Sequence, residues 1–128
     1  MKTRNQKGFT LVQAVFILVV LGLLGMVMVR LIGVQTSTGV MALQGARAYH
    51  AARSGLEWGA ARANAGESCV GTMMIDTVNV TVNCSSESFT EGSIGPYSIY
   101  RIQSVAEFGS YGSADYVSRR TEMKVGLP

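Results

Sequence analysis

The sequence predicts an α+β fold in which one long N-terminal helix packs on a small antiparallel β-sheet. The first observation is an apolar run over residues 9–29, which is long enough for a continuous helix. The second is a stripe of small residues at helical spacing between Met41 and Gly59. The third is strict alternation of apolar and polar residues over 78–84, which indicates a strand with one buried face.

The N-terminal segment carries basic residues first and an apolar run afterwards. Residues 1–8 contain three cations and no acidic residue, and Thr10 and Gln13 are the only polar residues in 9–29. As a helix, residues 9–29 are about 31 Å long, which is close to the hydrocarbon thickness of a bilayer. The basic end is expected to stay cytoplasmic, so residues 30–128 are expected to face outward.

Three interpretations of this segment are open. A secretory signal peptide has a shorter apolar core and a small-residue cleavage site after it, whereas Arg30 follows this run with no such site nearby. A permanent single-span anchor fits the length. The third interpretation rests on the position of Gly8 before the apolar run. Cleavage there would remove the charged leader and leave the hydrophobic helix on the mature protein.

This order of signals resembles the class III leader of type IV pilins and of the related pseudopilins of type II secretion. The residues that carry the resemblance are Lys7-Gly8-Phe9-Thr10-Leu11-Val12-Gln13. The resemblance implies that prepilin peptidase cleaves between Gly8 and Phe9 and methylates the new amine of Phe9. It divides the chain into a basic leader (residues 1–8), a transmembrane and filament-core helix (9–29) and a periplasmic pilin-like domain (30–128).

Within this family the likeness is to MSHA biogenesis minor pilins of the MshP type. It rests on residues 8–15 and on residues 45–58. The likeness implies a minor pilin, a structural subunit without catalysis or cofactor, that helps to initiate or cap an MSHA-type pilus. The implied partners are other major and minor pilins, prepilin peptidase and the assembly platform. The implied location is the bacterial inner membrane before assembly and the pilus, near its tip, afterwards.

Gln13 departs from the family pattern, because a glutamate is usual at this position. In the family, that glutamate neutralises the terminal amine of a neighbouring subunit inside the helix bundle. An uncharged amide costs less in hydrocarbon but cannot neutralise the amine. The resemblance therefore favours a place at the tip, where no neighbour's amine needs a partner. The alternative is that glutamine is tolerated anywhere in the filament and hydrogen-bonds the amine.

Residues 31–64 continue as an amphipathic helix with an unusually small apolar stripe. Tyr49, Leu56 and Ala63 widen this stripe. Its members, at alternating spacings of four and three, are Met41, Gly45, Ala48, Ala52, Gly55 and Gly59. Small residues allow another element to approach the helix backbone, whereas each glycine costs the helix roughly 1 kcal/mol relative to alanine. We therefore expect this part of the helix to pack on the sheet.

Four later segments have strand character. Residues 69–75 and 78–84 are predicted to form a hairpin that turns at Asp76-Thr77, and residues 97–108 and 116–127 to form two further strands. The polar residues 85–96 are predicted to be a loop. In the last strand the residues of one parity should face the helix: Val117, Thr121, Met123, Val125 and Leu127.

Cys69 and Cys84 suit one disulfide if the domain leaves the cytosol. They enclose 14 residues and are placed to staple the ends of the predicted hairpin. A bridge over such a loop contributes on the order of 3 kcal/mol, which matters for a small core.

Charge and motif content argue against several function classes. From Phe9 onward, eight basic residues balance eight acidic ones, so nothing indicates a nucleic-acid partner. His50, Ser54 and Glu57 share one helix face, which does not give the crossed geometry of a nucleophilic triad, and two cysteines alone do not make a zinc site. Besides the pilus subunit, the open alternatives are a minor pseudopilin of a type II secretion system, a non-polymerising single-span periplasmic adaptor, and an exposed adhesin.

Overall fold

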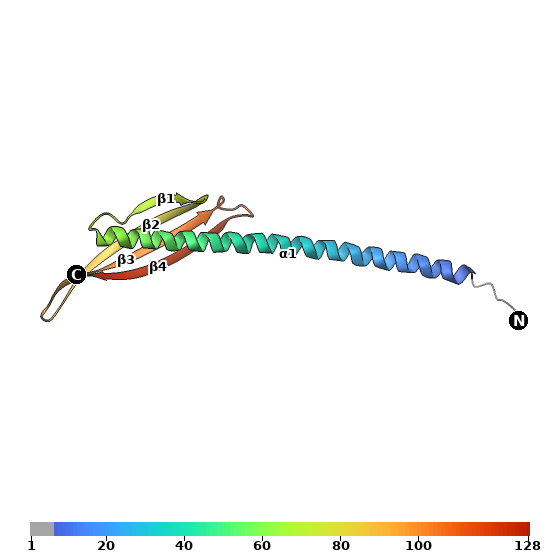
Figure 1. The fold of residues 1–128 in the computed structure, drawn as a ribbon, viewed down its shortest axis with the longest axis horizontal. Coiled ribbons are helices and arrows are strands. Elements are labelled where there is room, and N and C mark those ends of the chain that lie inside the picture. The colour runs from blue at the N-terminus through green and yellow to red at the C-terminus, as the bar shows by residue number, and fades with distance from the viewer. Residues whose placement is uncertain (1–6) are drawn as a thin grey trace. The chain divides into compact units, whose positions relative to one another are not determined.

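The computed structural model describes residues 7–128, and its side chains are described from Thr10 onward. Within this range the chain forms one helix, α1 (Lys7–Asn64), and four strands, β1 (Gly71–Ile75), β2 (Val78–Glu91), β3 (Ile94–Phe108) and β4 (Val117–Leu127). Figure 1 shows their order along the chain. The predicted α+β fold, a long N-terminal helix and an antiparallel sheet, is confirmed.

The chain divides into two compact units, residues 1–39 and residues 40–128. In the first unit the described residues form only helix. The second unit contains the remainder of α1 and the whole sheet. The small core lies in this second unit, between α1 and one face of the sheet.

The sheet is a meander in the order β1-β2-β3-β4, with every neighbouring pair antiparallel. β1 and β2 join through Asp76 and Thr77, as the sequence predicts. Both residues have positive φ angles, 46° and 67°, which is the geometry of the tight turn that fits the twist of a hairpin. Thr77 is a costly residue in this conformation because it is β-branched.

The prediction of a loop over residues 85–96 is wrong. β2 continues to Glu91 and β3 starts at Ile94, so only two residues separate the strands. Cross-strand contacts explain the extension: the rings of Phe89 and Tyr97 stack at 6.0 Å, and the Tyr97 hydroxyl donates to Glu91 Oε1 at 3.0 Å. The end of this hairpin projects past the end of β4 (Figure 1), which reaches only Ser98.

The small stripe of α1 packs on the sheet as predicted. Ala48 and Ala52 are fully buried, as are Val80, Val82 and Ile102 opposite them. Glycines in the stripe allow this approach, as residue 59 illustrates: a Cβ there would lie 2.9 Å from Ile102 Cγ2. Close packing of backbone and branched side chains thus replaces the larger aliphatic contacts of an ordinary helix–sheet interface.

Two residues of the predicted stripe are not part of the core. Met41 is 47% exposed and Tyr49 is 45% exposed. Gly45 is the first buried residue of the helix, and Arg119 lies over it, so the core begins after Met41. Tyr49 directly follows the buried Ala48, and the step of 100° per residue turns it away from the narrow strip that the sheet covers.

The predicted inward parity of β4 is confirmed. The members of that set are all partly buried, whereas Arg120, Glu122 and Lys124 between them are exposed. Arg119 shares the inward parity, and its guanidinium reaches the helix at Gly45, where an added Cβ would lie 3.1 Å from Nη2. A cation therefore closes the edge of the core at this end of the domain.

Candidate functional site

The N-terminal part of α1 exposes apolar side chains on every side. An 18-residue window of α1 near the N-terminus has a mean hydropathy of 2.8, and none of it is buried in the molecule. Leu11, Phe16 and Leu24 are each more than half exposed. This helix is long and apolar enough to span a membrane, and a surface of this kind must be covered by lipid or by other helices.

The backbone of Gly8 and Phe9 belongs to the first turns of α1, and their side chains lie outside the described residues. The peptide bond predicted to be cleaved therefore lies at the N-terminal end of the helix.

Gln13 lies in α1 one turn beyond residue 9 and is exposed. Val12, Phe16 and Ile17 beside it are exposed as well, so its amide stands in an apolar surface. Among the residues that the structure describes, no side-chain hydrogen bond involves this amide. An amide covered by hydrocarbon is costly unless it is hydrogen-bonded.

Two threonines further along α1 show the opposite situation. The hydroxyl of Thr36 donates to the carbonyl oxygen of Ile32, and that of Thr38 donates to the carbonyl oxygen of Val34, each at 2.9 Å. These hydroxyls satisfy themselves on the preceding turn of their own helix. They need no outside partner, which separates them from Gln13.

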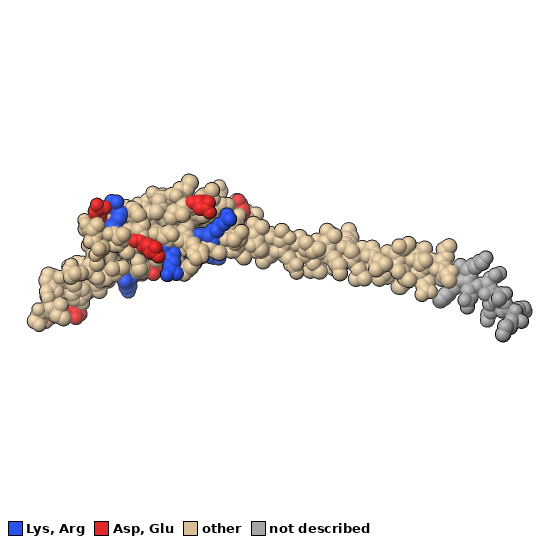
Figure 2. Space-filling view, in the orientation of Figure 1, with Lys and Arg blue, Asp and Glu red and all other residues tan. Residues whose placement is uncertain are grey.

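Charged side chains gather on the second unit. Figure 2 shows Lys, Arg, Asp and Glu over this unit, and the visible face of the apolar helix shows none. The ion pairs are exposed, as in Arg101–Glu122 at 3.4 Å and Arg53–Glu57 at 4.0 Å. Pairs of this kind contribute little to stability, so these charges serve mainly to present a polar surface.

The structure joins Cys69 and Cys84 in a disulfide with their Cα atoms 5.9 Å apart. The ladder between β1 and β2 pairs Gly71 with Val82, so Cys69 and Cys84 are the pair that lies two residues further along the same register, beyond the end of β1. Trp58 of α1 covers the same region, because a Cβ on Gly71 would lie 2.7 Å from its ring. The bridge therefore fixes the start of the sheet under the end of the helix.

Arg62 strengthens this corner. Its guanidinium lies 5.2 Å from the ring centroid of Trp58, and its Nε donates to the Ser68 carbonyl oxygen at 2.9 Å. Its Nη1 lies 3.1 Å from the carboxylate of Glu67. One side chain thus ties the last turn of α1 to the segment that enters β1.

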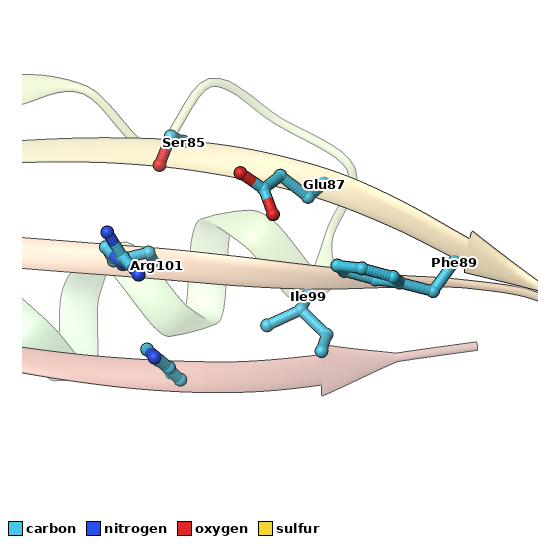
Figure 3. A pocket seen from close by; sticks show the side chains of 6 residues that line it. Ser85, Glu87, Phe89, Ile99 and Arg101 are labelled. Carbon is cyan, nitrogen blue, oxygen red and sulfur yellow. The ribbon is translucent and has the colours of Figure 1, made fainter.

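The outer face of the sheet, opposite α1, carries a hollow of about 140 Å³. Figure 3 shows that side chains of β2 and β3 meet around it. Its lining residues are Ser85, Glu87, Phe89, Ile99, Arg101 and Lys124. The sequence interpretation missed this surface because it placed half of the lining in a loop. The local sequence holds no clear signal for it, because residues 85–91 are rich in serine and are exposed on both faces.

The helix residues considered for catalysis are spread over an exposed face. Ser54 uses its hydroxyl to donate to the carbonyl oxygen of His50 at 3.0 Å, and the ring of His50 packs edge-on to Tyr49 at 5.8 Å. Within the described residues, His, Cys, Asp and Glu side chains form no group of three that would hold a metal ion.

Comparisons of the chain with protein-family models, with curated proteins and with solved structures found no match.

Proposed function

We propose that this chain is a minor pilin, a structural subunit that acts in the initiation or at the tip of a type IV pilus of the MSHA type. The observation that supports this most directly is the pairing of an apolar helix, exposed on all sides, with a small disulfide-bonded α+β domain. A helix of this kind is suited both to storage in a bilayer and to packing with like helices in a filament.

The leader residues supply the second support. Gly8 precedes the apolar run, so that cleavage by prepilin peptidase leaves the helix on the mature chain and exposes the amine of Phe9 for methylation. Before assembly the subunit lies in the inner membrane with its second unit in the periplasm. Its partners are other major and minor pilins and the assembly platform, and its role includes no catalysis.

Gln13 supports a place at the tip. Its amide has no side-chain partner among the described residues, and an amide cannot neutralise a buried amine. A subunit with glutamine here is poorly suited to repeated stacking and well suited to a position above which no further amine is inserted. We therefore propose few copies of this subunit, beside a minor pilin that carries the usual glutamate.

Deletion and labelling test this placement. Loss of an initiating subunit should reduce the number of filaments per cell more than their length, and the intact gene should restore the number.

An epitope inserted between Gly92 and Ser93, at the turn of the β2–β3 hairpin, is exposed for immunogold detection. Gold particles at the filament ends would support a tip position for this subunit. An epitope on the major subunit is the control that antibody also reaches the filament shaft. Gold spread evenly along shafts contradicts a tip position.

A further inference from the structure

The sheet of the second unit has one edge that stays open over several residues. β1 pairs with β2 only between Val78 and Val82, whereas β2 continues to Glu91. From Ser85 onward, β2 is therefore paired on one side only, with β3. The free backbone N–H and C=O groups of such an edge are a template for another strand.

The segment that enters β1 is held away from this edge. Arg62 binds the Ser68 carbonyl oxygen and the Glu67 carboxylate, which ties residues 67–68 to the end of α1. The disulfide between Cys69 and Cys84 marks the point where the segment and β2 part. Among the described residues, no backbone hydrogen bond outside the helix and the sheet ladders reaches residues 85–91.

Two other free edges of this sheet carry a feature that discourages strand addition. β4 bears three basic side chains, a feature that discourages edge-to-edge pairing. The free edge of β3 beyond the end of β4 contains Pro96, which has no N–H to donate. Residues 85–89 contain neither proline nor a cation, and their pairing with β3 is regular. The open edge of β2 therefore lacks the features that discourage strand addition at the free edges of β3 and β4.

The side chains beside this edge favour a basic strand. Glu87 and Glu91 are the only charged residues in 85–98. Glu87 has neither an ion pair nor a side-chain hydrogen bond within the described part of the chain. Phe89 is 40% exposed and Ile94 at the hairpin end is 62% exposed. In Figure 3, Glu87 and Phe89 leave β2 on the same face and border the hollow. The cations that also line the hollow, Arg101 and Lys124, lie on β3 and β4, on the side of β2 away from the open edge, so Glu87 is the charged side chain next to that edge.

We propose that residues 85–89 of β2 accept an extended basic segment of a neighbouring pilin subunit as an additional strand of this sheet. Backbone hydrogen bonds along the edge supply the attachment, and alternate side chains of the added strand supply the selectivity. A lysine or arginine of that strand pairs with Glu87, and an apolar residue next along its face lies against Phe89. The identity of the donor as a neighbouring subunit rests on the proposed function; the strand-accepting edge does not.

A peptide titration of the purified full chain in detergent micelles tests the edge. The probe is a short labelled peptide that repeats Lys-Thr-Val-Thr, so that lysine and valine follow one another along one face of the strand, and the comparison peptide replaces lysine with glutamate. We expect the basic peptide to bind and to protect backbone amides of residues 85–89 from hydrogen exchange. Glu87→Lys should weaken its binding about tenfold, because a charge-assisted pair is lost. The matched control is Glu57→Lys, which makes the same charge change on the exposed face of α1 and should leave binding unchanged.

Two N-methylated forms of the basic peptide distinguish backbone pairing from simple charge attraction. One form carries N-methyl groups on the residues whose N–H groups face β2, and the other carries them on the alternate residues, whose N–H groups face away. The first form should not bind and the second should, although the two peptides have the same charge. Equal binding of the glutamate peptide, equal binding of both N-methylated forms, or absence of protection at residues 85–89 would each overturn the proposal. Binding by a chain that retains Met1 would support the edge and contradict the filament role alone.

Discussion

Replacement of Gly55 by alanine tests whether close backbone approach holds α1 on the sheet. In a free helix this change is favourable by about 1 kcal/mol, because glycine loses more backbone entropy on folding. At this position a Cβ would lie 2.7 Å from Val80 Cγ1 and 3.1 Å from Val82 Cγ2, and it would also meet Ser104 Oγ. All three neighbours are fully buried.

The expected magnitude follows from these opposing terms. Overpacking of a closely packed core by one methyl group typically costs about 1–3 kcal/mol. The contact with a branched side chain of the central strands places Gly55→Ala near the upper end of this range. After subtraction of the helix-propensity gain, we expect a net loss of about 1–2 kcal/mol in the free energy of unfolding.

Gly45→Ala is the matched control within the same helix stripe. The only neighbour of an added Cβ at residue 45 is the guanidinium of Arg119, at 3.1 Å from Nη2. The end of an arginine side chain moves at little cost, so this variant should be as stable as the parent chain or up to about 1 kcal/mol more stable. Two identical substitutions on one helix are thus expected to differ in sign.

Urea unfolding of the full chain in detergent micelles measures both variants. Trp58 is the only tryptophan and lies over Gly71, so its fluorescence reports the packing of α1 on the sheet. In the double variant with Ser104→Ala, part of the loss should be recovered, because one of the crowded atoms is removed. An unchanged or raised stability of Gly55→Ala would refute the packing argument.

Three further predictions concern the second unit. Cys69→Ser should lower the free energy of unfolding by about 3 kcal/mol in the same urea assay, since the bridge closes a loop with a separation of 15 residues; equal stability of oxidised and reduced parent protein would contradict this. Thr77→Gly should raise stability by about 1 kcal/mol, because the φ of 67° is costly for a β-branched residue, whereas a loss would show that the threonine side chain stabilises the turn. The Tyr116 hydroxyl donates to Glu107 Oε1 at 2.7 Å, and this hydrogen bond raises the pKa of Tyr116 above its ordinary value of 10.0. The hydrogen bond therefore contributes to the free energy of unfolding below pH 10.0, and this contribution is lost as the pH rises through the raised pKa. In Glu107→Gln, tyrosinate absorbance should show that Tyr116 ionises at a lower pH than in the parent chain. An unchanged titration curve would contradict a hydrogen bond between Tyr116 and Glu107.

The layers of the fold follow from periodicity alone. Apolar side chains without a polar face predict the exposed N-terminal helix, and the small stripe around Ala48 and Ala52 predicts the close helix–sheet contact. Alternation in 78–84 predicts the central strand, and the polar pair Asp76-Thr77 predicts its turn. These signals are local because each depends on which side of a single element is buried.

The strand conformation at the end of the β2–β3 hairpin could not be predicted from local periodicity. Residues 85–91 are rich in serine and expose both faces, so no alternation of burial marks them as strand. Their strand conformation depends on pairing with β3 and on contacts such as Phe89 with Tyr97, which join residues that local patterns treat separately. Met41 and Tyr49 were wrongly placed in the core for a related reason, since helical spacing does not show how far a sheet extends along or around a helix.

The mass and N-terminal residue of the protein extracted from its native membrane test the central claim most directly. The pilin interpretation predicts a chain that begins at Phe9 and carries one N-methyl group, because cleavage after Gly8 retains the apolar helix. Replacement of Gly8 should block the cleavage and leave the leader attached. A wild-type chain that retains Met1 would contradict the account in favour of a permanent anchor, and a chain that begins beyond Arg30 would contradict it in favour of a secreted domain.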